Sequence, residues 1–244
     1  MKVFATGSYI ETFAGSSLNP AIWTQRNATM GTSSFDVSNG QLNFYVSTPT
    51  VVRTENNIGL WNLINLPTSQ SWTVMCGVHN TASFSPSNGA SQLQFAVADS
   101  SLSNYLGASL LWEKNLATTA PIFGLLSNSA PDYWGPGGVT ASAATNASIQ
   151  ISYDSFRNVL SLFTSLDGTN PISGNYNWTL FSTLNIDPSV VPTLNAVIAS
   201  NVYDVAVLQN QMWVDNFAII PEPSALSLLA IGLGGMAVMR RRRS

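Results

Sequence analysis

The chain contains one cysteine and one histidine, three residues apart, so nucleophilic catalysis is the first chemistry to consider. Cys76 and His79 lie in the alternating run of residues 72–79. In a β-strand, successive side chains point to opposite faces, so Cys76 shares the face of Val74 and Val78. His79 points the other way, and the thiol cannot pass a proton to it. We therefore predict that Cys76 is a small buried hydrophobic residue.

Paired carboxylates are the second chemistry to consider, because glycoside hydrolysis uses two of them about 5–9 Å apart. The chain has twelve acidic residues, and none lies within four positions of another. The sequence therefore predicts no catalytic residues. Six aspartates are predicted to be turn or loop residues: Asp99, Asp132, Asp154, Asp167, Asp187 and Asp204. One or two of them could hold a Ca²⁺ with backbone carbonyls, but the sequence assigns no ligands, and no other metal or cofactor is predicted.

Exposed aromatic rings are the third candidate, because sugar rings stack on them. Tyr133 and Trp134 lie in the Gly- and Pro-rich stretch of residues 131–138. We predict a carbohydrate-binding site there; the alternative is that both rings fold back over the body of the protein. Three other tryptophans are predicted to lie in the core: Trp23, Trp72 and Trp213.

The elements that must position these residues are β-strands. Residues 41–46, 91–97 and 149–153 alternate between apolar and polar, and the Ser-Asn-Gly at 38–40 predicts a hairpin turn. About ten to fourteen strands separated by turns indicate a sandwich or barrel. Only residues 102–112 are ambiguous between helix and strand. Eight residues are predicted to point between the sheets, and Gln92 and Gln94 lie on the opposite face of their strand. The eight are Leu93, Phe95, Val97, Ile149, Ile151, Leu160, Leu162 and Val214.

The charge of the chain is unevenly distributed. Charged residues make up 9% of the chain, against roughly 25% in soluble domains, and the formal net charge is −3. Without the four terminal arginines, five basic residues face twelve acidic ones, which leaves −7 on residues 1–239. A body this acidic repels phosphates, so we predict that the protein binds no nucleic acid.

The C-terminal segment combines prolines, an apolar run and arginines. Residues 225–239 carry no charge and, as a helix, would span about 22 Å of the roughly 30 Å hydrocarbon core. Snorkelling side chains can help to bridge the deficit. By the positive-inside rule, the arginines lie in the cytoplasm and residues 1–220 lie across the membrane. These arginines are Arg240, Arg241, Arg242 and Arg243.

Pro221, Glu222 and Pro223 precede this run as an extended segment that cannot continue a strand or a helix. A Pro-Glu-Pro triplet, an apolar span and terminal arginines, in this order, resemble the PEP-CTERM sorting signal of Gram-negative bacteria. The resemblance implies recognition by an exosortase, processing near the triplet, transient insertion of residues 224–239 in the inner membrane and delivery to the cell surface or exopolysaccharide matrix. It divides the chain into a body at 1–220 and a sorting signal at 221–244.

The N-terminus does not show the basic and apolar regions of a secretory signal peptide, because Thr6, Gly7, Ser8 and Glu11 interrupt it. Either the true start lies upstream of Met1 or export is in doubt. We favour an upstream start, since a sorting tail has no use on a protein that is never exported.

Short stretches of the body resemble concanavalin A-like lectin and glucanase domains: residues 13–23 followed by 37–42, residues 149–154 with 160–168 and then Trp178, and residues 213–217. This resemblance implies an all-β jelly-roll sandwich of two antiparallel sheets, to which the tail adds a single C-terminal hydrophobic helix. We predict an exported, non-catalytic surface or matrix protein associated with exopolysaccharide. The alternatives are a polysaccharide hydrolase or lyase with an atypical site, such as His79 with Tyr45 or Tyr153, and a purely structural or adhesive matrix component.

Overall fold

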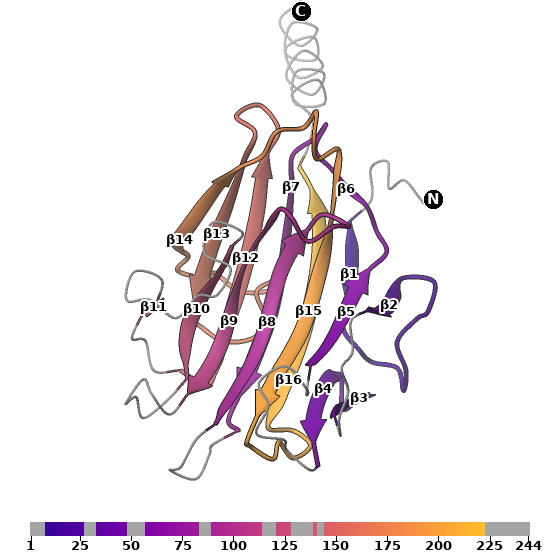
Figure 1. Ribbon diagram of the computed structural model, residues 1–244, viewed down its shortest axis with the longest axis vertical. Coiled ribbons are helices and arrows are strands. Elements are labelled where there is room, and N and C mark those ends of the chain that lie inside the picture. Colours follow the sequence, from indigo (N-terminus) through magenta and orange to yellow (C-terminus); the bar gives the residue numbers. More distant parts are fainter. Residues whose placement is uncertain are drawn as a thin grey trace, which may run out of the picture.

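The computed structural model of the protein describes residues 8–26, 33–47, 57–82, 89–113, 121–127, 139–140 and 144–222. In these ranges the chain forms sixteen β-strands in two antiparallel sheets of eight strands, which confirms the all-β prediction (Figure 1). None of the described residues forms a helix long and apolar enough to cross a membrane. The predicted helix at residues 225–239 lies outside the described residues.

Sheet A has the strand order β14-β13-β12-β7-β16-β4-β3, with β1 paired to β16. β7 and β16 are neighbours in the middle of this sheet, where Trp72 pairs with Pro221 and Asn80 with Met212. The strands are β1 (Tyr9–Glu11), β3 (Ser33–Ser38), β4 (Gln41–Val46), β7 (Trp72–Asn80), β12 (Asn146–Asp154), β13 (Val159–Ser165), β14 (Thr179–Asn185) and β16 (Met212–Pro221).

Sheet B has the order β11-β10-β9-β8-β15-β5-β2, with β6 paired to β15. The strands are β2 (Trp23–Arg26), β5 (Asn57–Asn62), β6 (Leu66–Pro67), β8 (Ala90–Ala98), β9 (Tyr105–Glu113), β10 (Ile122–Ser127), β11 (Val139–Thr140) and β15 (Thr193–Tyr203). The stretch that was ambiguous in sequence, residues 102–112, contributes most of β9. Its Gly, Ala and Ser residues fit a strand here because β9 lies between β8 and β10.

Turn chemistry explains the hairpins. Asn39 and Gly40 both have positive φ, 56° and 75°, which is the backbone of a two-residue hairpin turn between β3 and β4. Asn158, at φ 57°, ends the turn between β12 and β13. The predicted turn at 38–40 is therefore confirmed.

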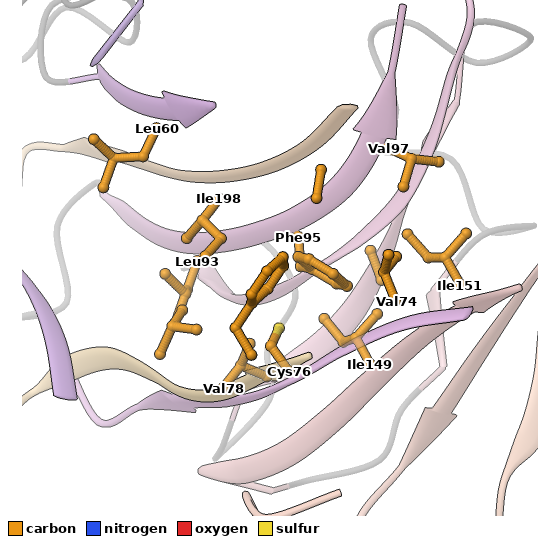
Figure 2. Close-up of a cluster of buried hydrophobic side chains, with 14 of the residues drawn as sticks. Leu60, Val74, Cys76, Val78, Leu93, Phe95, Val97, Ile149, Ile151 and Ile198 are labelled. Carbon is orange, nitrogen blue, oxygen red and sulfur yellow. The ribbon is translucent and has the colours of Figure 1, made fainter. Parts of the chain in front are cut away.

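The core lies between the two sheets, as Figure 2 shows. All eight residues predicted to point inward are fully buried. The strands of sheet B bend so that their concave side faces away from this core (Figure 2). Trp23 and Trp72 are core residues as predicted, but Trp213 is not. It lies on the outer face of sheet A, half-buried and stacked on His79, because its position in β16 alternates with the inward-facing Met212 and Val214.

Candidate functional site

A row of polar side chains crosses the concave outer face of sheet B. Gln92 and Gln94 on β8 point to this face, because they alternate along the strand with Leu93 and Phe95, which point into the core. Ser109 on β9 lies opposite Gln94, and Asn201 on β15 lies opposite Gln92. The Gln94 Nε2 donates to Gln92 Oε1 at 3.0 Å, so the two amides are linked along the strand.

One acceptor in this row lacks a partner. The side-chain oxygen Oδ1 of Asn201 is buried and accepts no hydrogen bond. Gln92 beside it is only 3% exposed, although it points away from the core. An unpaired buried acceptor costs about 1–3 kcal/mol, so a hydroxyl or amide donor that reached Asn201 would recover this free energy.

Small residues flank Gln94 on the neighbouring strands. Across the sheet, the residues in register with Gln94 are Gly59 and Ala199 on one side and Ser109 and Gly124 on the other. A Cβ on Gly124 would lie 2.6 Å from Leu111 Cδ2 and 2.9 Å from Ser109 Oγ, so no larger residue fits there without a shift. The amide of Gln94 is therefore flanked by small residues on both neighbouring strands.

A pocket of about 360 Å³ lies at the edge of the sandwich, where β13 and β14 meet β10. Its volume falls in the range of small-molecule sites. Its one carboxylate, Asp167, already accepts from Ser165 Oγ at 3.1 Å and from the Asn177 N–H. The lining residues are Phe123, Thr164, Ser165, Leu166, Asp167, Asn177, Thr179, Leu180 and Phe181.

Cys76 and His79 are kept apart, as predicted. Cys76 is fully buried in the core, and burial, with the charge of Asp215 as a smaller cause, raises the pKa of its thiol well above the usual value. A thiol in this state is unreactive. His79 lies on the outer face of sheet A, with its ring 4.6 Å from that of Trp213. Partial burial lowers the pKa of His79, and a hydrogen bond with Asn146 offsets part of this.

The pairing of His79 with Tyr153 is also ruled out by the strands. Tyr153 is fully buried and points into the core, where its hydroxyl donates to Thr68 O at 3.2 Å. His79 lies on the opposite face of the same sheet. A His–Tyr site for a lyase therefore cannot form from these two residues.

The predicted turn aspartates act as turn residues where they are described. Asp99 Oδ1 accepts from the Ser101 and Ser103 N–H groups, and Asp187 Oδ1 from the Ser189 N–H. Burial raises the pKa of the Asp99 carboxyl, but hydrogen bonds from Asn104, Ser101 and Ser103 outweigh this effect and lower it. Hydrogen bonds from the hydroxyl and the N–H of Ser189 lower the pKa of Asp187. Asp132 lies outside the described residues. Among the residues that are described, no three His, Cys, Asp or Glu side chains gather as around a metal ion. A Ca²⁺ site stays a prediction.

The first two residues of the Pro-Glu-Pro triplet belong to the sandwich. Pro221 is the last residue of β16, and the Glu222 N–H donates to Ser71 O at 3.1 Å. The prediction that the triplet cannot continue a strand is therefore wrong for Pro221. Its missing N–H is tolerated because Pro221 is the final residue of the strand. Glu222 is exposed. Pro223 and the arginines Arg240, Arg241, Arg242 and Arg243 lie outside the described residues.

The loop aromatics Tyr133 and Trp134 also lie outside the described residues, so the structure does not place them. The alternation of residues 91–97 identified Gln92 and Gln94. Sequence reasoning missed Ser109 and Asn201, whose strands contribute to the same row. For Asn201 no clear signal was available, because Val197 and Ala199 on its face are apolar while Ser200 on the core face is polar.

Comparison with known proteins separates the tail from the body. A family model described as the PEP-CTERM protein-sorting motif matches residues 220–243. A sequence comparison with curated proteins gives no match.

The body resembles solved structures of low sequence identity. A pseudo β-1,3-glucanase of Mycobacterium tuberculosis, Rv0315, is 10% identical, with a TM-score of 0.56 over 88% of this chain and 98% of that one. A structure from work on endo-acting O-glycanases of the human gut microbiota, which initiate mucin breakdown, is 10% identical, with a TM-score of 0.54 over 87% and 98%. The winged bean acidic lectin in complex with methyl-α-D-galactose is 10% identical, with a TM-score of 0.51 over 89% and 99%. The chain thus joins a body with the fold of concanavalin A-like lectins and glucanases to a PEP-CTERM protein-sorting motif at residues 220–243.

Proposed function

We propose that this is an exported protein of a Gram-negative bacterium. An exosortase processes it, and it then binds carbohydrate at the cell surface or in the extracellular matrix without catalysing a reaction. The match of residues 220–243 to the protein-sorting motif supports the sorting half of this proposal. The polar row on the concave face of sheet B, with its unpaired Asn201 Oδ1, supports the binding half.

In the sorting half, the apolar run at residues 225–239 inserts into the inner membrane. The arginines Arg240, Arg241, Arg242 and Arg243 stay on its cytoplasmic side. The body then stands on the periplasmic side, and the exosortase recognises Pro221, Glu222 and Pro223. After processing, the body moves to the surface or the exopolysaccharide matrix.

Changing Glu222→Ala tests the sorting half. We expect the protein to remain unprocessed in the membrane fraction of cells that carry an exosortase, because the motif has lost its carboxylate. Asp187→Asn is the control, since Asp187 is an exposed carboxylate at the same end of the sandwich. Processing is measured by gel mobility. Normal processing of the Glu222→Ala protein would contradict the proposal.

In the binding half, the chemistry of the polar row suits the hydroxyl groups of a polysaccharide. Each amide of Gln92, Gln94 and Asn201 can donate and accept, as can the Ser109 hydroxyl, and neighbouring hydroxyls of a sugar ring need both. Asn201 Oδ1 would gain the donor it lacks. Tyr133 and Trp134 would add stacking surface, and the double change Tyr133→Ala with Trp134→Ala should then weaken binding without unfolding the protein.

The spacing of acidic residues in the sequence supports a non-catalytic role. A glycosidase needs two carboxylates about 5–9 Å apart, which alternate positions of one strand would supply, and no two acidic residues of this chain lie within four positions of each other. Release of sugar from a polysaccharide by the purified protein would favour the enzyme alternative. Failure to bind any glycan would favour a structural or adhesive matrix role.

A glutamine on each face of the sandwich makes a matched test of binding. Gln94 on the concave face and Gln150 on the outer face of sheet A are both half-buried, and each donates through Nε2 to a side chain two residues away. We expect Gln94→Ala with Asn201→Ala to abolish binding to exopolysaccharide in a pull-down. Gln150→Ala should bind like the unchanged protein. Equal binding by all three proteins would contradict the concave-face site.

A further inference from the structure

The sorting motif begins on the sandwich itself, without a linker. β16 ends at Pro221, which pairs with Trp72, and Glu222 is tied to Ser71 by a backbone hydrogen bond. Two residues, Pro223 and Ser224, separate Glu222 from the apolar run that begins at Ala225. Three steps along the chain span at most about 11 Å. The first residue of the apolar run therefore lies no more than about 11 Å from Glu222.

Two turns lie at the same end of the sandwich as Glu222. The turn between β12 and β13 is there because Tyr153 pairs with Trp72, and the Ser155 N–H donates to Ser71 Oγ at 3.0 Å. The connection between β14 and β15 lies next to this turn, because the Ile186 N–H donates to Asn158 O. Figure 1 shows both connections at the upper end of the sandwich, where β16 ends. We call this the motif end; it comprises Ser71, Pro221, Glu222 and residues 154–159 and 186–191.

The motif end carries the two most exposed large hydrophobic side chains of the described residues. Phe156 is 93% exposed and Val190 is 70% exposed. Arg157 beside Phe156 has a side chain that is 77% exposed and lies 3.7 Å from Asp154. Peripheral membrane segments bury Phe and Leu side chains at the boundary between headgroups and acyl chains and keep neighbouring Lys and Arg side chains in the polar layer.

We propose that the motif end rests on the lipid surface while the tail is anchored, with Phe156 and Val190 in the interfacial layer of the bilayer. This inference rests on the proposed insertion of residues 225–239 in the membrane. With that run in the hydrocarbon core, Glu222 lies within about 11 Å of it, in the headgroup region, which is roughly 5–8 Å thick on each side, or just outside it. Both hydrophobic side chains then leave water without a change in the fold.

Charge does not drive this contact. Asp154, Asp187 and Glu222 outnumber Arg157 at the motif end, so it carries a net negative charge and anionic lipids would repel it. The proposed contact is therefore an apolar contact with zwitterionic lipids. Such a contact should depend little on salt. Because the strands run from the motif end to the opposite end (Figure 1), the body stands upright on the membrane and its concave face points sideways, away from the lipid.

The test uses the full chain in phosphatidylcholine vesicles that contain headgroup spin-labelled lipid. Cys76 is buried, so a fluorescent thiol label can be directed to Ser189→Cys at the motif end or to Ala206→Cys, between β15 and β16, at the opposite end. Ser189 and Ala206 are both small residues with exposed side chains. Flotation of the vesicles reports anchoring, and quenching by the spin label reports contact. We expect both proteins to float and only the label at residue 189 to be quenched, at low and at high salt.

The outcomes separate this inference from the proposed anchoring. Failure of both proteins to float would overturn the anchoring on which the inference rests. Flotation with equally weak quenching at both positions would overturn the inference alone. Adding Phe156→Ser and Val190→Ser to the Ser189→Cys protein should reduce quenching while flotation persists. Unchanged quenching would show that these side chains do not make the contact.

Discussion

The two outer faces of the sandwich are built from the same alternation, yet the chain treats them differently. On sheet A, the connection between β13 and β14 packs on the outer face. There Ser148 Oγ donates to Gly168 O at 2.7 Å and Asn216 Nδ2 to Thr169 O at 3.2 Å. On sheet B, Asn201 Oδ1 on the concave face is buried but has no partner. One face is closed by carbonyls of the same chain, and the other keeps an unpaired acceptor.

This difference shows that outward-pointing Ser, Asn and Gln residues do not by themselves mark a binding site. Ser148 on sheet A and Ser109 on sheet B occupy comparable central positions, but Ser148 serves a covering loop. Asn43 on sheet A also has an unpaired Oδ1, but its Nδ2 is held by the Ser38 backbone and hydroxyl. The candidate site is the place where several amides lie together next to an unpaired acceptor.

The largest effect is expected where the covering loop meets sheet A. A Cβ on Gly77 would lie 1.9 Å from the Thr169 carbonyl oxygen, which is backbone and cannot turn aside. Gly77→Val should therefore force the loop off the face and lower the free energy of unfolding by about 1–3 kcal/mol or more. Urea unfolding followed by tryptophan fluorescence measures this change.

Gly15→Ala is the matched control, because its new Cβ would meet Ser17 O at 3.6 Å, an ordinary contact. It should leave the unfolding midpoint almost unchanged. If Gly77→Val were as stable as Gly15→Ala, the close packing of the loop on sheet A would be wrong.

A smaller effect of opposite sign is expected on the concave face. Asn201→Leu removes the unpaired oxygen and keeps the size of the side chain, so stability should stay equal or rise by roughly 1 kcal/mol. Glycan binding should be lost in the same protein, because the acceptor is gone. Thermal unfolding and a polysaccharide pull-down measure the two properties. A marked loss of stability would mean that Asn201 is a structural residue and would remove it from the proposed site.

The smallest effect concerns Asp215, which lies opposite Gly77 in sheet A. Burial raises the pKa of this carboxyl, although hydrogen bonds from Asn216 lower it in part. A raised pKa in the folded state means that stability from protonated Asp215 is present at low pH and is lost as pH rises through that pKa. Asp215→Asn should therefore stabilise the protein slightly at pH 7. The difference should vanish below about pH 4, where both states are protonated. A variant less stable at pH 7 would contradict this sign.

The sequence predicted the fold well because alternation of period two survives in the buried strands. Leu93 and Phe95 against Gln92 and Gln94 define both faces of β8 without any knowledge of the rest of the chain. The opposite faces of Cys76 and His79 follow from the same rule. The hairpin at Asn39 and Gly40 was readable because those residues favour the positive φ that the turn requires.

The site was less predictable, because it is made by strand neighbours that are distant in sequence. Asn201 reaches Gln92 only through the pairing of β15 with β8, about a hundred residues apart along the chain, and no local pattern encodes that pairing. Trp213 was predicted to lie in the core, although the predicted inward direction of the adjacent Val214 already implies that Trp213 points outward, where it stacks on His79. Pro221 was predicted to lie outside the sandwich because a proline cannot occupy the interior of a paired strand. The structure places it in β16 because the last position of a strand tolerates a proline.

The side-chain amide signals of the glutamines offer the most direct test of the central claim, that the concave face is the binding face. In ¹H–¹⁵N spectra recorded during titration with exopolysaccharide fragments, the NH₂ signals of Gln92 and Gln94 should shift. The signals of Gln150, on the outer face of sheet A, should stay in place. Shifts confined to Gln150, or binding without any shift of Gln92 and Gln94, would contradict the claim.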